Sequence, residues 1–160
     1  MEKNVKDIEG RHLNLIEAEF VNVRQSTVRS VEGGTIELQQ VGAVSIDGER
    51  IDVTQGASII LKGDNLNLNQ SMAILSAGTN NNLNFSFTPI SVSDNTNIDK
   101  SATGVVIANN IKSSNSTSIL TIAKNIEGNV TTLLDWKSAL TLSAIAGGLL
   151  AFLGLVNRKI

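Results

Sequence analysis

The chain contains no cysteine and no tyrosine, and it has only one histidine, one tryptophan and one proline in 160 residues. Without cysteine it can form no disulfide, no thiolate metal site and no cysteine nucleophile. His12 would have to be the sole imidazole of any catalytic triad, and a histidine-rich metal site is excluded. Neither a Walker-type phosphate loop nor a Gly-x-Gly-x-x-Gly fingerprint occurs. We therefore predict that the protein is not an enzyme and has no catalytic residue, cofactor or metal ion.

Charge and aromatic side chains are also scarce. Thirteen Lys and Arg stand against fifteen Asp and Glu, and aromatic residues make up 3% of the chain. A nucleic-acid-binding domain usually carries a basic patch, often with aromatic side chains that stack on bases. This composition predicts no nucleic-acid partner. The apolar residues are mainly Val, Ile and Leu with Asn, Ser and Thr between them, which favours short β-strands and small polar turns.

A fifteen-residue repeat is the strongest signal in the sequence. Four consecutive rows of fifteen residues, counted from Phe20 and ending at Thr79, align without gaps. The second and fourth columns are occupied by Val, Ile or Leu in every row. The sixth column is always glutamine and the fourteenth is always glycine, and their members are Gln25, Gln40, Gln55, Gln70, Gly33, Gly48, Gly63 and Gly78. Such a repeat is the signature of a repetitive architecture.

The columns predict an all-β, single-stranded β-solenoid with coils of about fifteen residues. Apolar residues two apart lie on one face of a strand, so the second and fourth columns should point into a narrow core. Glycine tolerates positive φ, so the fourteenth column should mark a corner between two short strands per row. If rows stack about 4.8 Å apart, the four glutamines form an amide ladder. A series of antiparallel hairpins in a meander or sandwich is the alternative, because it also gives period-two patterning.

The sequence divides into five segments. Residues 1–19 are interpreted as a degenerate N-terminal cap, 20–79 as the regular solenoid and 80–130 as irregular coils rich in Asn, Ser and Thr. Residues 136–157 are predicted to form a transmembrane helix and 158–160 a basic tail. Terminal coils of repeat proteins are commonly atypical because they cap an open stack.

Two features of the Asn-rich part shape this division. Three asparagines, Asn80, Asn81 and Asn82, are interpreted as an insertion, after which alternation resumes until Pro89 ends it. The stretch between Asp64 and Asp94 contains no charged residue. Uncharged, β-prone segments pair readily with other chains, so this stretch is either a neutral solenoid face or a self-association surface.

The C-terminal stretch Ser138–Val156 has no charged residue. As a helix it would span about 28 Å, close to the thickness of the hydrocarbon core of a bilayer. Trp136 precedes it, and an indole favours the membrane interface. Small residues that allow close helix packing recur at Ser143, Gly147 and Ala151. A buried core helix and an interfacial or partner-bound helix are the alternatives to a membrane-spanning one.

The coils of Val, Ile and Gly over residues 20–79 resemble those of bactofilins and related polymer-forming β-solenoid proteins. The resemblance implies filaments built through end-to-end contact of solenoids, and attachment to membranes. Bactofilins usually attach through an N-terminal segment, whereas this chain offers a C-terminal one. The glutamine column and the Asn-rich segment are further departures from the family.

Together these observations predict a non-enzymatic, membrane-anchored scaffold that associates with copies of itself through its coils. The N-terminus has acidic residues and no apolar stretch, so we expect a cytoplasmic solenoid with a single-pass C-terminal anchor in the lipid. An accessory stalk or docking subunit of a larger membrane complex is the main alternative, and a trimeric phage or surface spike is another.

Overall fold

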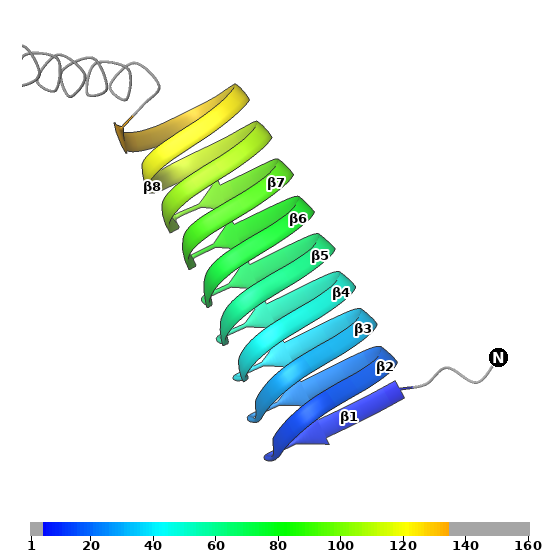
Figure 1. Ribbon diagram of the computed structural model, residues 1–160. Coiled ribbons are helices and arrows are strands. Elements are labelled where there is room, and N and C mark those ends of the chain that lie inside the picture. The colour runs from blue at the N-terminus through cyan, green and yellow to red at the C-terminus, as the bar shows by residue number, and fades with distance from the viewer. Residues whose placement is uncertain (1–4, 135–160) are drawn as a thin grey trace, which may run out of the picture.

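The protein is a parallel β-solenoid whose coils are stacked one above another (Figure 1). The structure is a computed structural model, and it describes residues 5–134. Strand β1 lies at one end of the stack and β8 at the other, with consecutive strands always adjacent. The predicted all-β solenoid with coils of about fifteen residues is therefore confirmed.

Each regular coil contributes one long strand, where the repeat predicted two short ones. Strands β2 to β7 each have 13 residues, so all but two residues of a coil take part in the sheet. The final strand runs for 33 residues and includes more than two coils. The strand bounds are β1 Val5–Glu9, β2 His12–Arg24, β3 Thr27–Gln39, β4 Gly42–Thr54, β5 Ala57–Asn69, β6 Met72–Asn84, β7 Phe87–Asp99 and β8 Ala102–Leu134.

All seven strand pairings are parallel and place each residue beside the one fifteen positions further on. Val21 pairs with Ile36, Ile36 with Ile51 and Ile51 with Leu66. Antiparallel hairpins, the alternative interpretation of the pattern, are thereby excluded for the described residues. The register begins in the N-terminal segment, where Val5 pairs with Phe20.

The Asn-rich part keeps the same register, so the predicted insertion at Asn80–Asn82 is wrong. Leu66 pairs with Asn81, and Leu68 pairs with Leu83, without any shift. Pro89 lies inside β7, and pairing continues to Asp99 beside Ser114. The main-chain ladder does not depend on side-chain polarity, because the backbone N–H and C=O groups form it. From residue 80 to residue 114 the coils are thus regular and carry polar side chains.

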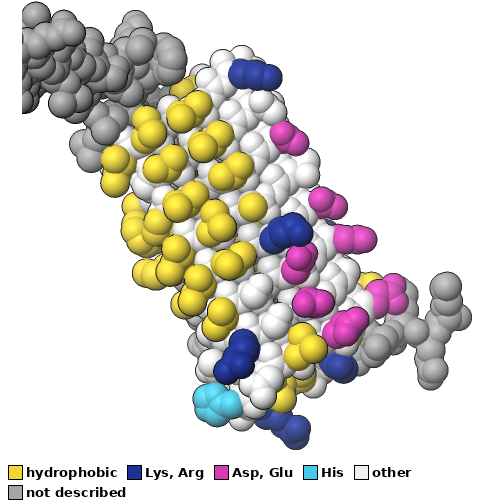
Figure 2. Space-filling model, in the orientation of Figure 1, with side chains coloured by type: hydrophobic (Ala, Val, Ile, Leu, Met, Phe, Trp, Pro, Cys, Tyr) yellow, Lys and Arg dark blue, Asp and Glu magenta, His cyan; other side chains and the backbone are white. Residues whose placement is uncertain are grey.

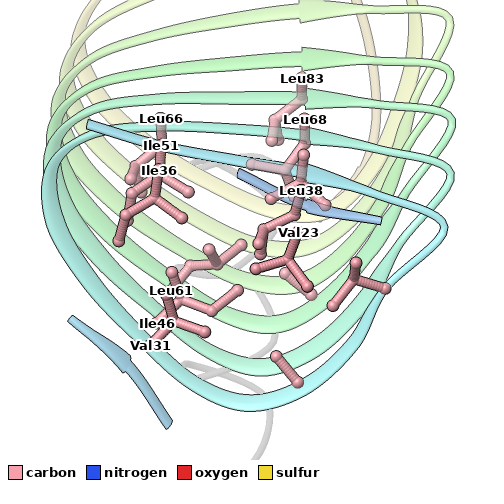
Figure 3. Packing of buried hydrophobic residues seen from close by; sticks show 14 of the residues in the cluster. Val23, Val31, Ile36, Leu38, Ile46, Ile51, Leu61, Leu66, Leu68 and Leu83 are labelled. Carbon is pink, nitrogen blue, oxygen red and sulfur yellow. The ribbon is translucent and has the colours of Figure 1, made fainter. Parts of the chain in front are cut away.

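The core is a narrow channel filled by columns of aliphatic side chains (Figure 3). One column contains Ile36, Ile51 and Leu66, and a second contains Leu38, Leu68 and Leu83; all are buried. A third column, on the opposite wall, consists of Val31, Ile46 and Leu61. No aromatic side chain belongs to the core of the described residues. Equivalent aliphatic side chains of successive coils therefore contact one another along the solenoid axis.

The corner of each coil lies at the glutamine column, whereas the sequence predicted it at the glycine column. The backbone has positive φ at Gln25, Gln40, Gln55 and Gln70, between 47° and 55°. Gly10 falls in the same column and shares this conformation, with φ of 65°. The left-handed region closes the turn after the thirteen-residue strand, and it costs a non-glycine residue about 1–2 kcal/mol.

The glycines of the fourteenth column serve close approach between coils. A Cβ placed on Gly48 would lie 2.6 Å from the carbonyl oxygen of Gly33, and one on Gly78 would lie 2.5 Å from that of Gly63. A Cβ on Gly33 or Gly63 would likewise collide with the carbonyl oxygen one coil earlier. None of these four residues has positive φ. Glycine is required here because there is no room for a side chain.

The predicted transmembrane helix at 136–157, with Ser143, Gly147 and Ala151, and the basic tail at 158–160 lie outside the described residues. Within residues 5–134 there is no helix with the length and apolar character needed to cross a bilayer.

Candidate interaction surfaces

The glutamine column forms an exposed amide ladder along one corner of the solenoid. Nε2 of Gln25 donates to Oε1 of Gln40 at 3.3 Å, and the same bond joins Gln40 to Gln55 and Gln55 to Gln70. The ladder ends at Phe85, whose ring lies 5.0 Å from Nζ of Lys100. These bonds are solvent-exposed, so the ladder fixes side-chain positions more than it adds stability.

Buried serines reinforce the same corner from inside. Oγ of Ser71 donates to the carbonyl oxygens of Asn69 and Val53, and it accepts a bond from the backbone N–H of Gly56. Ser86 repeats these contacts one coil later. Each hydroxyl satisfies backbone groups that the tight corner leaves out of the sheet. The corner is therefore a structural element built from side chains.

A second amide ladder runs along the first column of the coil and forms part of a polar face. Nδ2 of Asn80 donates to Oδ1 of Asn65 at 3.0 Å, and the chain of bonds continues through Asn95 and Asn110 to Asn125. A parallel row joins Asp52, Asn67, Asn82 and Asn97. Most of the amide groups on this face bond to one another along the axis. Because the side chains here are asparagines, the face is polar but uncharged in the middle coils.

A buried polar cluster interrupts the core in the middle of the stack. Asn81 is 2% exposed and occupies the column that holds Leu66 one coil earlier. Its Nδ2 donates to Oγ of Ser76 at 3.3 Å and to Oγ of Ser91 at 3.1 Å. Its Oδ1 has no hydrogen-bond partner among the described residues. A buried acceptor without a partner costs about 1–3 kcal/mol.

Replacing Asn81 with leucine is expected to stabilise the solenoid. The change removes the unpaired Oδ1 and buries an apolar side chain at the cost of two weak bonds, for a net gain of about 1 kcal/mol. Urea denaturation of the full chain in detergent, followed by circular dichroism, measures the gain. Asn82→Leu is the matched control, because Asn82 is exposed and should gain nothing. A lower urea midpoint for Asn81→Leu would show that the cluster stabilises the core instead.

An exposed apolar surface runs along one side of the solenoid, where Figure 2 shows hydrophobic side chains gathered along its length. We call this surface the apolar flank. It occupies the eighth, tenth and eleventh columns of the coil, joined in the later coils by the thirteenth column. Its large exposed members are Val44, Ile59, Ile60, Met72, Ile74, Phe87, Ile90, Val92, Ile107, Ile119 and Ile122.

Charged groups lie mainly away from the flank. Figure 2 shows most acidic side chains on the other side of the same view. Exposed ion pairs join Arg50 to Asp52 at 3.2 Å and Lys62 to Asp47 at 3.5 Å. Such pairs contribute about 0–1 kcal/mol each. His12 is exposed, and the part of the chain that the structure describes has no cluster of three potential metal ligands.

The structure places the sequence-predicted residues in two separate groups. The four glutamines form an exposed corner ladder, and the four glycines are packed against the preceding coil. The sequence pattern predicts only part of the apolar flank. The uncharged stretch between Asp64 and Asp94 contains the middle part of the flank. The whole flank extends from Val44 to Ile122. The signal that could have found it is the recurrence of apolar residues in the tenth and eleventh columns.

Comparisons of the chain with protein-family models, with curated proteins and with solved structures each give no match.

Proposed function

We propose that the protein is a non-enzymatic, membrane-anchored scaffold whose solenoid associates with further copies of itself. The fold fits a structural role, because every coil is built to stack on the next. The anchor in this proposal is the uncharged stretch 138–156, and the solenoid is the part that presents surfaces outside the bilayer.

The observation that supports the proposal most is the unbroken register of the stack. Parallel pairing runs from β1 through β7 into β8, and it spans the Asn-rich segment without interruption. From Val5 to Asn125 the chain climbs eight coils, or about 38 Å at about 4.8 Å per coil. A continuous sheet with a packed core is stiff, which is what a spacer or scaffold requires.

The terminal strands provide a second support. Among the described residues β1 pairs with β2 only, so one of its edges carries main-chain groups without a strand partner. Exposed strand edges are templates for addition of another strand. Association through coil ends, as in the polymer-forming solenoids that the repeat resembles, would use this edge.

Membrane attachment is tested by placing a charge in the uncharged stretch. Leu150→Lys in the full chain is expected to weaken membrane integration, because lysine near the centre of a spanning helix costs about 2.5–3.5 kcal/mol. Asn157→Lys at the edge of the stretch is the matched control and should leave integration unchanged. The measurement is the fraction of protein that stays with membranes after alkaline carbonate extraction.

The result that contradicts attachment is equal, complete extraction of the unmodified chain and both variants. Light scattering of the detergent-extracted chain adds a separate readout for association. More than one copy per particle is expected, and single copies at all concentrations would contradict the self-association part of the proposal.

A further inference from the structure

We propose that the apolar flank is a lateral interface along which a second copy of the chain packs side by side and in the same direction. The inference rests on the self-association in the proposed function and names the surface and the orientation that achieve it. It differs from end-to-end stacking, because the flank runs parallel to the solenoid axis (Figure 2).

The flank is uncharged over six consecutive coils. The eighth, tenth and eleventh columns contain no charged residue from Gly42 to Leu120. The last charged residue in these columns before Gly42 is Arg29, in the preceding coil. Ile74, at the centre of the flank, is 47% exposed, and Phe87 is 44% exposed. Contiguous exposed apolar patches of this kind commonly mark interaction sites.

The size of the flank suits a specific interface. Six coils at about 4.8 Å give a length of about 29 Å, and five residues of strand give a width of about 17 Å. The flat area is then about 500 Å² per copy and about 1,000 Å² for a pair, which reaches the lower size of specific protein interfaces. A patch of this extent is at the upper end of what monomers leave exposed.

A second copy fits the flank better than a lipid surface does. Surfaces that bind lipid headgroups carry Lys and Arg, and the six-coil flank has none in its three main columns. The neighbouring thirteenth and fifteenth columns include Glu32, Asp47, Glu49 and Asp64, which an anionic bilayer would repel. An uncharged, apolar sheet surface is instead matched by another such surface at about 10 Å separation.

The chain's own stretch 138–156 is a poorer match for the flank. That stretch has no charged residue on any side, so a helix formed by it would keep an apolar surface in water after covering the flank. A second solenoid has the opposite property, because its other faces carry the asparagine ladder and the charged residues.

The thirteenth column determines the direction of packing. It is charged in the earlier coils, at Glu32, Asp47 and Lys62, and apolar in the later coils, at Val92 and Ile107. An antiparallel pair would lay the charged half of one copy on the apolar half of the other and desolvate those charges. A parallel pair places the apolar half of the thirteenth column against Met72 and Phe87 of the eighth column. It places Asp47 and Lys62 only against Gly42 and Ala57, small residues that leave the charges open to water. It also brings residue 134 of both copies to the same end, as two anchors in one membrane require.

A two-fold axis along the centre of the flank gives complementary sizes. It would set the eighth column of one copy opposite the thirteenth column of the other. The eighth column contains Met72 and Phe87, and the thirteenth column of the same coils contains Ala77 and Val92. Large side chains would thus meet smaller ones in the same layer, which is the condition for close packing.

Cysteine cross-linking of the full chain in membranes tests the interface, because the natural chain contains no cysteine. Ile74→Cys lies on the flank and Asn82→Cys lies on the polar face of the same strand β6. Since packed sheets lie about 10 Å apart, a bismaleimide of about that span should give about tenfold more dimer with Ile74→Cys than with Asn82→Cys. Equal yields from the two variants would overturn the proposal.

A mixture of Val44→Cys and Ile119→Cys chains tests the direction. These residues lie near opposite ends of the flank, five coils apart in the same column. A parallel pair joins Val44→Cys only to itself and Ile119→Cys only to itself, as read by mass spectrometry of the cross-linked peptides. Links between the two different positions would overturn the parallel arrangement.

Two further outcomes distinguish other occupants of the flank. An intramolecular link between Ile74→Cys and Leu149→Cys, without dimer, would show that the chain's own C-terminal stretch covers the flank and would overturn the inference. Multiple copies per particle without any flank cross-link would also overturn it, while self-association through coil ends in the proposed function would stand.

Discussion

Replacing Gly63 with valine is expected to lower the free energy of unfolding by about 3 kcal/mol, at the upper end of the range for overpacked sites. A Cβ at this position would collide with the carbonyl oxygen of Gly48, a backbone atom of the preceding coil. It would also lie 3.1 Å from Cδ2 of Leu66 and 3.2 Å from Cδ1 of Ile51. The oxygen cannot move away without breaking the inter-coil ladder, so the whole layer must separate locally.

The measurement is the urea midpoint of the full chain in detergent, with the slope of the transition checked for constancy. Gly42→Val is the matched control. The nearest atom to a Cβ on Gly42 is a side-chain methyl of Thr27 at 3.9 Å, so valine fits there and suits a strand. Equal midpoints for the two variants would contradict the close-approach role of the glycine column.

Leu66→Ala is expected to cost about 2–5 kcal/mol, the range for truncating a fully buried leucine. Leu66 has no exposed surface, and it lies between Ile51 and Asn81 in its column. The narrow core has no adjacent large side chain free to fill the space, because each layer holds only a few inward residues. A cavity would therefore remain.

The control for this substitution is Leu15→Ala, because Leu15 is exposed and lies two coils before Val44, where the apolar flank begins. Truncation there should change the free energy of unfolding by no more than about 0.5 kcal/mol. Hydrogen exchange of β4 to β6 is a second measurement, since in a stacked solenoid the loss is expected to appear first in neighbouring coils. Equal losses for the two leucines would argue against a core organised in columns.

The period of the repeat is enough to predict the stack. Identical glutamines at fifteen-residue spacing indicate that like residues lie above one another, and the bonds from Gln25 to Gln70 follow directly. Val, Ile and Leu in the second and fourth columns indicate which side chains point inward. The stacking and the inward-facing columns depend on spacing alone, so they can be predicted without knowing the path of the backbone.

The backbone path was less predictable, because glycine has two separate uses. The fourteenth-column glycines suggested a corner by their tolerance of positive φ, but they serve close approach between coils. A signal for the real corner was present. Gly10 occupies the glutamine column, and serines such as Ser71 and Ser86 recur just after it. Glycine and serine are both common turn residues, so their occurrence in two neighbouring columns indicates a turn there.

In the Asn-rich coils, side-chain polarity is a poor guide to register, because the backbone ladder continues there unchanged. Asn81 stands where Leu66 predicts an apolar residue, and its amide is held by Ser76 and Ser91 inside the core. Only the three-dimensional neighbours reveal that partners exist. The apolar flank could likewise be recognised only from the structure. Adjacent residues such as Ile59 and Ile60 are both exposed, where simple strand alternation would bury one of them.

The constant coil length makes the height of the rod proportional to the length of its gene. An in-frame duplication of fifteen codons would add one layer of about 4.8 Å, with the cross-section and the facing of every column preserved. The new layer would meet the same main-chain partners above and below, as pairing from β2 to β7 already shows for successive coils. Evolution can thus change the reach of this protein stepwise, without redesigning its interior.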